Sequence, residues 1–284
     1  MQIVDNNTLY IADTGNNRVV VVRPGSTNAT AIIGSLGNAS NQLSSPTDVF
    51  VTSTSIYILD TLNYRVQRCS RNGSNGTTVA GITSSAGNSS STTTFGVSYG
   101  IYVDKYGYLY VSDQSNHRVL RFAPGSSSGD NGVVVAGTGS NGSAPWELNA
   151  PSKVFVDEIG AMYIADTNNH RVQKWSYGAC SGVTVAGTGT SGTGAGQLNF
   201  PVAVVIDSNQ FMYIADQSNH RIQRWAPGGC SGECLVGCSG TSGSGSNLLS
   251  SPQSLAFDNQ GALYVSDGGN HRLQRFLLTS GIGK

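Results

Sequence analysis

The chain has 284 residues, a formal net charge of zero and only 11% charged residues. A chain with this balance lacks the excess of positive charge that broad binding to a phosphate backbone requires, which disfavours nucleic acid as a partner. No apolar run is as long as a membrane helix, which needs about 18 residues. The first residues, Met-Gln-Ile-Val-Asp, lack the basic and apolar segments of a signal peptide.

Short β-branched and aromatic runs separated by Gly, Asn, Asp and Ser recur from residue 2 to residue 276, and no segment shows helical periodicity. The most regular unit predicts strands at 153–157, 161–166, 171–175 and 183–187. Four antiparallel strands in sequence order are typical of one β-propeller blade. The chain therefore reads as all-β.

One motif occurs once in each unit: Asp, two spacers, Asn, one spacer, Arg and an aliphatic residue. Its copies lie at 13–19, 60–66, 113–119, 166–172, 216–222 and 267–273. Self-similarity at a period of about 50 residues is the signature of a propeller, solenoid or array. The six copies use nearly the whole chain, so we predict a single domain, residues 1–284, folded as a six-bladed β-propeller of four-stranded antiparallel blades.

The segment 160–173, Gly-Ala-Met-Tyr-Ile-Ala-Asp-Thr-Asn-Asn-His-Arg-Val-Gln, closely resembles the central motif of the NHL-repeat β-propeller family, and all six units match it in part. The resemblance implies a six-bladed toroid in which the first strand of each blade lines the axis and the fourth faces outward. Members of this family include protein-binding and RNA-binding modules, extracellular interaction modules and a peptide-amidating lyase. The resemblance thus implies a fold without selecting one function.

The sixth unit ends just after its third predicted strand, at residues 272–276, so the outer strand of this blade is missing from the chain. An uncovered strand edge is a template for pairing. We expect either that the chain is a fragment or processed product of a longer protein, or that a neighbouring molecule caps the edge by strand addition.

The repeated Asp, Asn and Arg invite a catalytic interpretation, and all four histidines, His117, His170, His220 and His271, lie within the motif. A catalytic group is needed once, at a unique geometry, whereas a residue repeated in every blade serves the scaffold. We therefore predict an Asp–Arg or Asn–backbone staple in each blade.

Enzymes that resemble the lyase or the lactonases hold a metal at the axis. The residues four positions before the end of each first strand, which should approach one end of the axis, are Met1, Asp48, Gly100, Lys153, Ala203 and Ser254. One carboxylate and no histidine make a poor cage for zinc or calcium. The sequence also lacks a distinctive Ser-His-Asp or Cys-His arrangement, so we predict no catalytic residues, metal or cofactor, and we name Asp48 and Lys153 as candidates for axial binding.

The five cysteines do not form a disulfide framework. Cys69 stands where other units have Phe or Trp, which predicts a buried, inert thiol. Cys180 and Cys230 occupy equivalent positions after Trp175 and Trp225. A metal cluster of Cys230, Cys234 and Cys238 lacks a fourth ligand, so a local disulfide among Cys180, Cys230, Cys234 and Cys238 is favoured, with the pairing left open.

Seven Asn-x-Ser/Thr sequons lie at predicted turns or loops, and all belong to the first half of the chain. Their asparagines are Asn6, Asn28, Asn38, Asn72, Asn75, Asn88 and Asn141. If the protein is secreted, the first three blades carry sugar and the last three are bare. A bare flank beside an unfinished blade predicts a contact with a protein partner or with another copy.

Together these patterns predict a secreted, N-glycosylated, non-enzymatic interaction or structural module that forms part of a repetitive assembly or fibre. The alternatives are a propeller enzyme resembling the peptide-amidating lyase or a lactonase, and an intracellular protein- or RNA-binding NHL module. Contact with a membrane is not expected.

Overall fold

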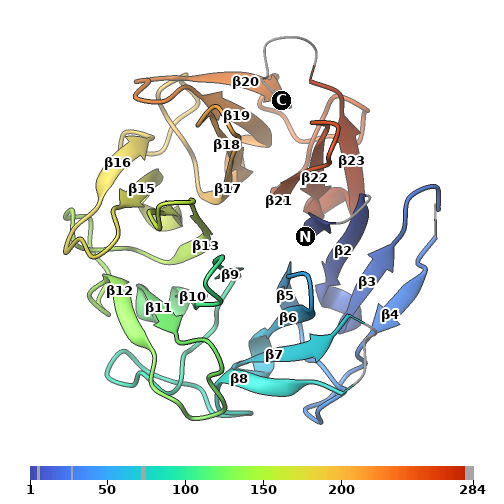
Figure 1. The fold of residues 1–284 in the computed structure, drawn as a ribbon. Helices are drawn as coiled ribbons and strands as arrows, with labels where there is room; N and C mark the ends of the chain where they lie inside the picture. Colours follow the sequence, from blue (N-terminus) through green and yellow to red (C-terminus); the bar gives the residue numbers. More distant parts are fainter. Residues whose placement is uncertain (5–6, 27, 72–74, 279–284) are drawn as a thin grey trace. The chain divides into compact units, whose positions relative to one another are not determined.

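The computed structural model describes residues 1–4, 7–26, 28–71 and 75–278. The described strands form six separate antiparallel sheets, each of which is one blade with its strands in sequence order (Figure 1). None of the described residues form a helix with the length and apolar character needed to cross a bilayer. The chain divides into two compact units, Met1–Asn141 and Gly142–Lys284.

The first unit contains three four-stranded blades. Blade 1 consists of β1 (Gln2–Val4), β2 (Thr8–Asp13), β3 (Arg18–Val22) and β4 (Ala31–Ile33). Blade 2 consists of β5 (Pro46–Val51), β6 (Ser55–Asp60), β7 (Arg65–Ser70) and β8 (Thr77–Gly81). Blade 3 consists of β9 (Gly100–Val103), β10 (Leu109–Asp113), β11 (Arg118–Phe122) and β12 (Val133–Gly137).

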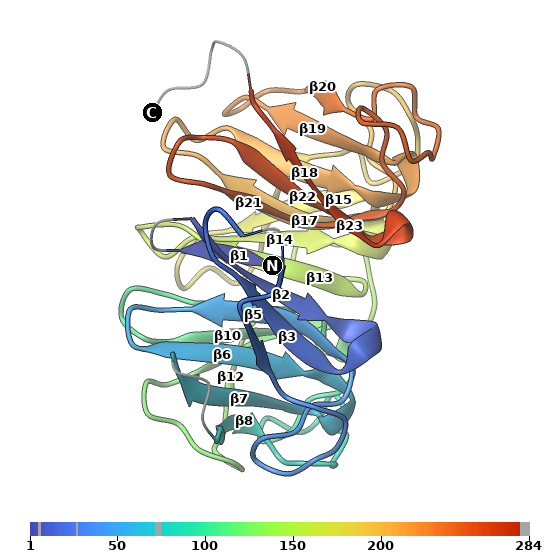
Figure 2. The same cartoon turned by 90° about the vertical axis from the view of Figure 1, so that its right-hand side faces the viewer.

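The second unit contains two four-stranded blades and one three-stranded blade. Blade 4 consists of β13 (Pro151–Val156), β14 (Met162–Asp166), β15 (Arg171–Trp175) and β16 (Val183–Ala186). Blade 5 consists of β17 (Pro201–Ile206), β18 (Met212–Asp216), β19 (Arg221–Trp225) and β20 (Gly232–Val236). Blade 6 consists of β21 (Pro252–Phe257), β22 (Leu263–Asp267) and β23 (Arg272–Phe276), which lie side by side in Figure 2.

These blades confirm the predicted fold class, an all-β β-propeller of six blades in which the sixth has three strands among the described residues. Within the first unit β1 contacts β5 and β5 contacts β9, and within the second β13 contacts β17 and β17 contacts β21. The first strands of consecutive blades therefore lie next to one another in each unit. That residues 1–284 form one domain stays a prediction.

Apolar side chains on both faces of the strands form a shared core between consecutive blades of a unit. Blades 1 and 2 bury Val19 and Ile56 in one cluster, whereas blades 5 and 6 bury Ile222 and Leu263 in another. A blade has two faces, so each internal blade packs against a neighbour on both sides. This packing explains why the strands carry β-branched residues throughout.

A short 3-10 turn joins the second and third strands of every blade, and the next residue closes it in the left-handed conformation. The left-handed residues are Asn17, Tyr64, His117, His170, His220 and His271, with φ between 50° and 55°. Their amide groups donate back to the first residue of the turn, as from His170 N to Thr167 O at 3.1 Å. The motif thus reverses the chain between two strands.

Gly187 follows β16 at φ +82°, and a Cβ there would lie 2.3 Å from the carbonyl oxygen of His170. Gly189 has a similar φ of +85°, but no atom lies within 4 Å of its Cβ position. A substitution at Gly189 therefore meets backbone strain alone, whereas one at Gly187 meets both backbone strain and a steric conflict with the motif turn.

We expect Gly189→Ala to lower the free energy of unfolding by about 1–2 kcal/mol, because a left-handed residue then carries a Cβ. Gly187→Ala should lower it further, since the turn at His170 must also move. Denaturant unfolding of both variants measures the difference. Equal losses would show that the close approach at Gly187 is unimportant.

Candidate functional site

The repeated motif forms the same hydrogen-bonded staple in all six blades. The motif Arg donates from Nε to the Asp carboxylate at 2.7–2.9 Å, and the motif Asn donates from Nδ2 to the same carboxylate at 2.8–3.0 Å. In blades 2 to 6 the other carboxylate oxygen accepts a backbone N–H from the segment before the first strand, as from Asn199 N to Asp216 Oδ1 at 2.6 Å. The predicted Asp–Arg staple is therefore present.

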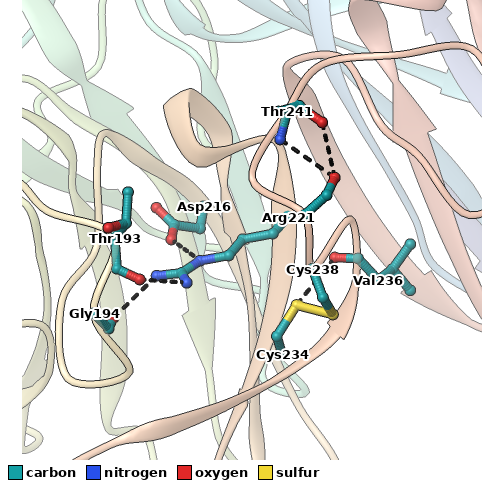
Figure 3. The surroundings of a disulfide bond; sticks show 9 residues. Thr193, Gly194, Asp216, Arg221, Cys234, Val236, Cys238 and Thr241 are labelled. Atoms are coloured by element: carbon teal, nitrogen blue, oxygen red, sulfur yellow. Dashed lines mark hydrogen bonds and ion pairs between the residues drawn. A yellow bond between two sulfur atoms is a disulfide. The ribbon is translucent and has the colours of Figure 1, made fainter.

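In blades 2 to 6 the motif arginines also hold the loop that enters the blade. Arg221 donates from its terminal nitrogens to the carbonyl oxygens of Thr193 and Gly194 at 2.8 and 3.1 Å (Figure 3). It also donates to the carbonyl oxygen of Gln197 at 3.0 Å. Equivalent bonds link Arg65, Arg118, Arg171 and Arg272 to their own entry loops. Because these donors are occupied, the arginines of blades 2 to 6 belong to the scaffold.

Burial dominates the electrostatics of most staples. Burial raises the pKa of Asp60, Asp113, Asp166 and Asp216, against the donors that favour the ionised carboxylate. At Asp267 burial also acts to raise the pKa, but the donors, which include Gln274 at 3.1 Å, outweigh it and lower the pKa. A staple thus specifies geometry at a desolvation cost.

In blades 1, 4 and 5 the left-handed residue after the 3-10 turn accepts a hydrogen bond from the next blade of its unit. Asn17 Oδ1 accepts from Ser45 N at 2.8 Å, His170 Nδ1 from Phe200 N at 3.2 Å and His220 Nδ1 from Ser251 N at 3.1 Å. The rings of His170 and Phe200 also meet edge to face, with centroids 4.7 Å apart. His170 and His220 therefore join neighbouring blades, in agreement with a scaffold role for the motif.

Burial lowers the pKa of His170 below its ordinary value of 6.5, although the nearby Asp216 carboxylate opposes the shift. A protonated Nδ1 cannot accept the Phe200 N–H, so the neutral ring suits the folded state. His170 thus favours folding at neutral pH.

The axial candidates have different environments. Asp48 is buried, and its carboxylate accepts from the amino group of Met1 at 3.5 Å and from Ile101 N at 3.1 Å. It therefore connects the three first strands of its unit. Lys153, on β13 of the other unit, is partly exposed, and Met1, Gly100, Ala203 and Ser254 are buried. Ligand binding through Asp48 and Lys153 stays a prediction.

Within the described part of the chain, no three His, Cys, Asp or Glu side chains gather closely enough to hold a metal ion. The histidines are spread over different blades, one to a motif, rather than converging. The described side chains therefore include no cluster of this kind for a metal ion.

Cys234 and Cys238, both in the predicted set, form a disulfide across the end of β20 (Figure 3). Cys180 and Cys230 are free and exposed. Cys69 is buried, as predicted, and burial raises its pKa to about 11. Its thiol therefore stays protonated at neutral pH and is a poor nucleophile.

The sequon asparagines all belong to the first unit, Met1–Asn141. Asn6 and Asn72 lie outside the described residues. The other five, Asn28, Asn38, Asn75, Asn88 and Asn141, are exposed. Exposure meets the steric requirement for glycosylation, while occupancy stays a prediction.

Two features were not recognised from the sequence. The inter-blade hydrogen bonds of the histidines depend on a left-handed backbone. The sequence indicates this conformation only in blade 1, where Asn17, a residue type that favours it, stands at the equivalent position. The amide of Gln67 is buried without a hydrogen-bond partner. The sequence does carry a sign of this feature. In three other units an aromatic residue follows two positions after the equivalent Gln, but Cys69 follows Gln67.

The fold and the staples together define a β-propeller whose blades are fastened by a repeated Asp-Asn-Arg motif. Residues 249–276 match the family model described as the NHL repeat, which confirms the resemblance predicted from the sequence. A comparison with curated protein sequences found no match.

Several solved structures share the fold. An auxiliary nutrient binding protein from Bacteroides thetaiotaomicron aligns with a TM-score of 0.69 and 16% identity over 95% of this chain and 66% of its own. A virginiamycin B lyase from Staphylococcus aureus aligns with a TM-score of 0.55 and 11% identity, over 98% of this chain and 83% of its own. A gluconolactonase from Xanthomonas campestris aligns with a TM-score of 0.64 and 13% identity, over 93% of this chain and 80% of its own. At these identities the likeness concerns the fold alone.

We expect Arg118→Gln to lower the free energy of unfolding by about 3–5 kcal/mol, because it leaves the fully buried Asp113 without its ion-pair partner. Arg18→Gln breaks the equivalent pair in blade 1, where the Arg18 side chain is 37% exposed and Asp13 26%, and should cost only about 0–1 kcal/mol. Denaturant unfolding compares the two. Similar losses would contradict the dependence on burial.

We expect part of the stability to be lost as the pH falls from about 7 through the lowered pKa of His170, because the unfolded state binds a proton first. His170→Asn should remove that part, since Asn tolerates the left-handed backbone and its oxygen accepts as Asn17 does in blade 1. Unfolding free energies of both proteins at pH 7 and 5 test this. An unchanged pH dependence in the variant would contradict it.

Proposed function

We propose that this chain is an extracellular, N-glycosylated, non-enzymatic interaction module. The observation that carries the proposal is the contrast between its polar groups. The repeated Asp, Asn and Arg are engaged by the scaffold, whereas the five described sequon asparagines are exposed and lie within one unit. The Cys234–Cys238 disulfide also suits an oxidising compartment.

The partner surface in this proposal belongs to the sequon-free unit, Gly142–Lys284. No glycan is expected to cover it. Within the described residues, β23 is an edge strand of the three-stranded sixth blade, so its outer backbone groups are open to strand addition. A protein partner or a second copy would pair there. Self-assembly into a repetitive structure is part of the proposal and would require each copy to offer a second surface as well.

A second candidate is a propeller enzyme, because solved structures with this fold include a virginiamycin B lyase and a gluconolactonase. The non-enzymatic role is favoured because the motif Asp, Asn and Arg are hydrogen-bonded within the scaffold and the four histidines belong to four different blades. Metal analysis of the purified protein separates the two candidates. Stoichiometric zinc or calcium that survives dialysis would favour the enzyme.

A third candidate, an intracellular protein- or RNA-binding module, is less compatible with the neutral charge. Retention of RNA that decreases with rising salt would favour it.

The glycosylation prediction is tested on native material by intact mass before and after enzymatic removal of N-glycans. We expect a mass loss that peptide mapping assigns to residues of the first unit, because their side chains are exposed. In a secreting host, Asn88→Gln should remove one glycan. The exposed Asn209 lies outside any sequon, so Asn209→Gln should leave the mass of the glycans unchanged. Native protein without glycans would remove the basis of the proposal.

A further inference from the structure

The third strand of blades 2 to 5 is covered by the fourth strand of the same blade. In each of these third strands the five residues that start with the motif Arg share one burial pattern, in which all but the fourth are buried. The third strand of blade 6, β23, has a closely similar sequence, yet four of its residues are partly exposed and Arg275 is exposed. β23 is therefore a strand of the covered type that lacks its cover among the described residues.

The four covering strands end in one shared pattern, an aliphatic residue, then Ala or Val, then Gly. The segments that carry this pattern are 77–81, 133–137, 183–187 and 233–237. In all four the Ala or Val pairs with the aliphatic residue that follows the motif Arg, as Ala186 pairs with Val172, and the register shifts directly after this pair. The five-bladed repetition thus records which sequence fits a third strand.

The final Gly of the pattern is required by the backbone. In the four segments its φ lies between 71° and 82°, and a Cβ would lie 2.1–2.3 Å from the carbonyl oxygen of the left-handed residue that closes the motif turn. Any side chain there meets both backbone strain and backbone atoms. In blade 6 the equivalent carbonyl belongs to His271, which is exposed and has a φ of 51°. A strand that covers β23 in the same register must therefore place a Gly beside His271.

The small residue before the Gly is specified by packing. Ala80, Ala136 and Ala186 are at most 4% exposed, and each pairs with a fully buried Val of the third strand. Leu273 of β23 stands at the position of these valines, directly after the motif Arg, and is partly exposed. A small aliphatic side chain opposite Leu273 would complete its burial.

We propose that the outer edge of β23 binds an extended segment of a partner protein that carries the pattern aliphatic, Ala or Val, Gly. The segment runs antiparallel to β23, with its small residue opposite Leu273 and its Gly beside the carbonyl oxygen of His271. Backbone hydrogen bonds provide the affinity, and the positions for small residues provide the selectivity. This inference rests on the partner surface of the proposed function and adds the sequence that this surface selects.

The segment comes from a partner protein rather than from a second copy. The four segments of this chain that carry the pattern are already paired within their own blades. A second copy could release one of them only by opening a blade and exposing its buried residues. The unit that contains β23 has no sequon, so no N-glycan attached to this unit is expected to obstruct the edge.

The test is fluorescence anisotropy of a labelled peptide, Ser-Gly-Val-Thr-Val-Ala-Gly-Thr, which copies residues 181–188 and is titrated with the full chain. We expect saturable binding, and binding about tenfold weaker or more for the same peptide with Val in place of its second Gly. Val favours extended strands more than Gly does, so strand propensity would produce the opposite order. Amide hydrogen exchange should become slower at residues 272–276 when the peptide binds.

Two extended chains connect binding to β23 without altering it. Adding Val-Thr-Val-Ala-Gly-Thr after Lys284 leaves the eight residues 277–284 between β23 and the added strand, compared with seven, 176–182, in blade 4 and ten, 123–132, in blade 3. This extension should occupy the edge and abolish peptide binding. The matched extension Val-Pro-Pro-Ala-Gly-Thr should leave binding unchanged, because Pro lacks the N–H that a strand donates.

The proposal is overturned if no saturable binding occurs at chain concentrations up to about 0.5 mM. Equal binding of the Gly and Val peptides, binding that survives the first extension, or slowed exchange only outside 272–276 would also overturn it. Self-association of the chain that the first extension abolishes would assign the edge to a second copy and overturn the choice of partner. The glycan analysis tests the proposed function separately, because native protein without glycans removes the extracellular role whether or not the peptide binds.

Discussion

The structure depends on the contact between an Asp carboxylate, an Asn amide and an Arg guanidinium, made once in each blade and more exposed in blade 1 than in the others. One carboxylate fastens the second strand to the third and to the segment before the first, while the same Arg holds the carbonyl groups of the entry loop. Charged groups are expensive to bury, so each must be fully hydrogen-bonded, and this requirement allows little variation in the loop path. Repetition of the motif therefore produces repetition of the blade.

This division of labour explains why the richest motif in the chain carries no evident chemistry. Its carboxylates and guanidinium groups are committed, and its histidines at 170 and 220 accept backbone hydrogen bonds from the next blade. Functional differences must then arise where repetition fails. Such places are the exposed sequons of the first unit, the disulfide at the end of β20 and the replacement of a ring by Cys69. Solved structures of this fold include a lyase, a gluconolactonase and a nutrient binding protein, which shows how little the scaffold restricts function.

A cavity of about 30 Å³ beside Cys69 illustrates what a single departure does in a repeat. Gln67 and Gly76 keep the roles that support an indole in blade 5, yet the side chain between them is too small to use them. The indole of Trp225 contributes both volume and an N–H donor in blade 5, whereas Cys69 contributes neither to blade 2, where a void and an unpaired Gln67 amide lie together. In a protein without repeats, no equivalent position would show which side chain is missing.

The blades could be predicted from the sequence alone, because a period near 50 residues, alternating strands and the Asp-Asn-Arg spacing all reflect local backbone geometry. It also predicted the staples, the burial of Cys69 and a disulfide among four cysteines. Three further features could not be predicted without the folded structure: the pairing of Cys234 with Cys238, the hydrogen bonds of Asp48 to Met1 and Ile101, and the absence of a hydrogen-bond partner for the Gln67 amide. These outcomes depend on which residues of different strands and blades meet in space. Spacing along the chain records the repeat, whereas partners and cavities arise only when the blades pack.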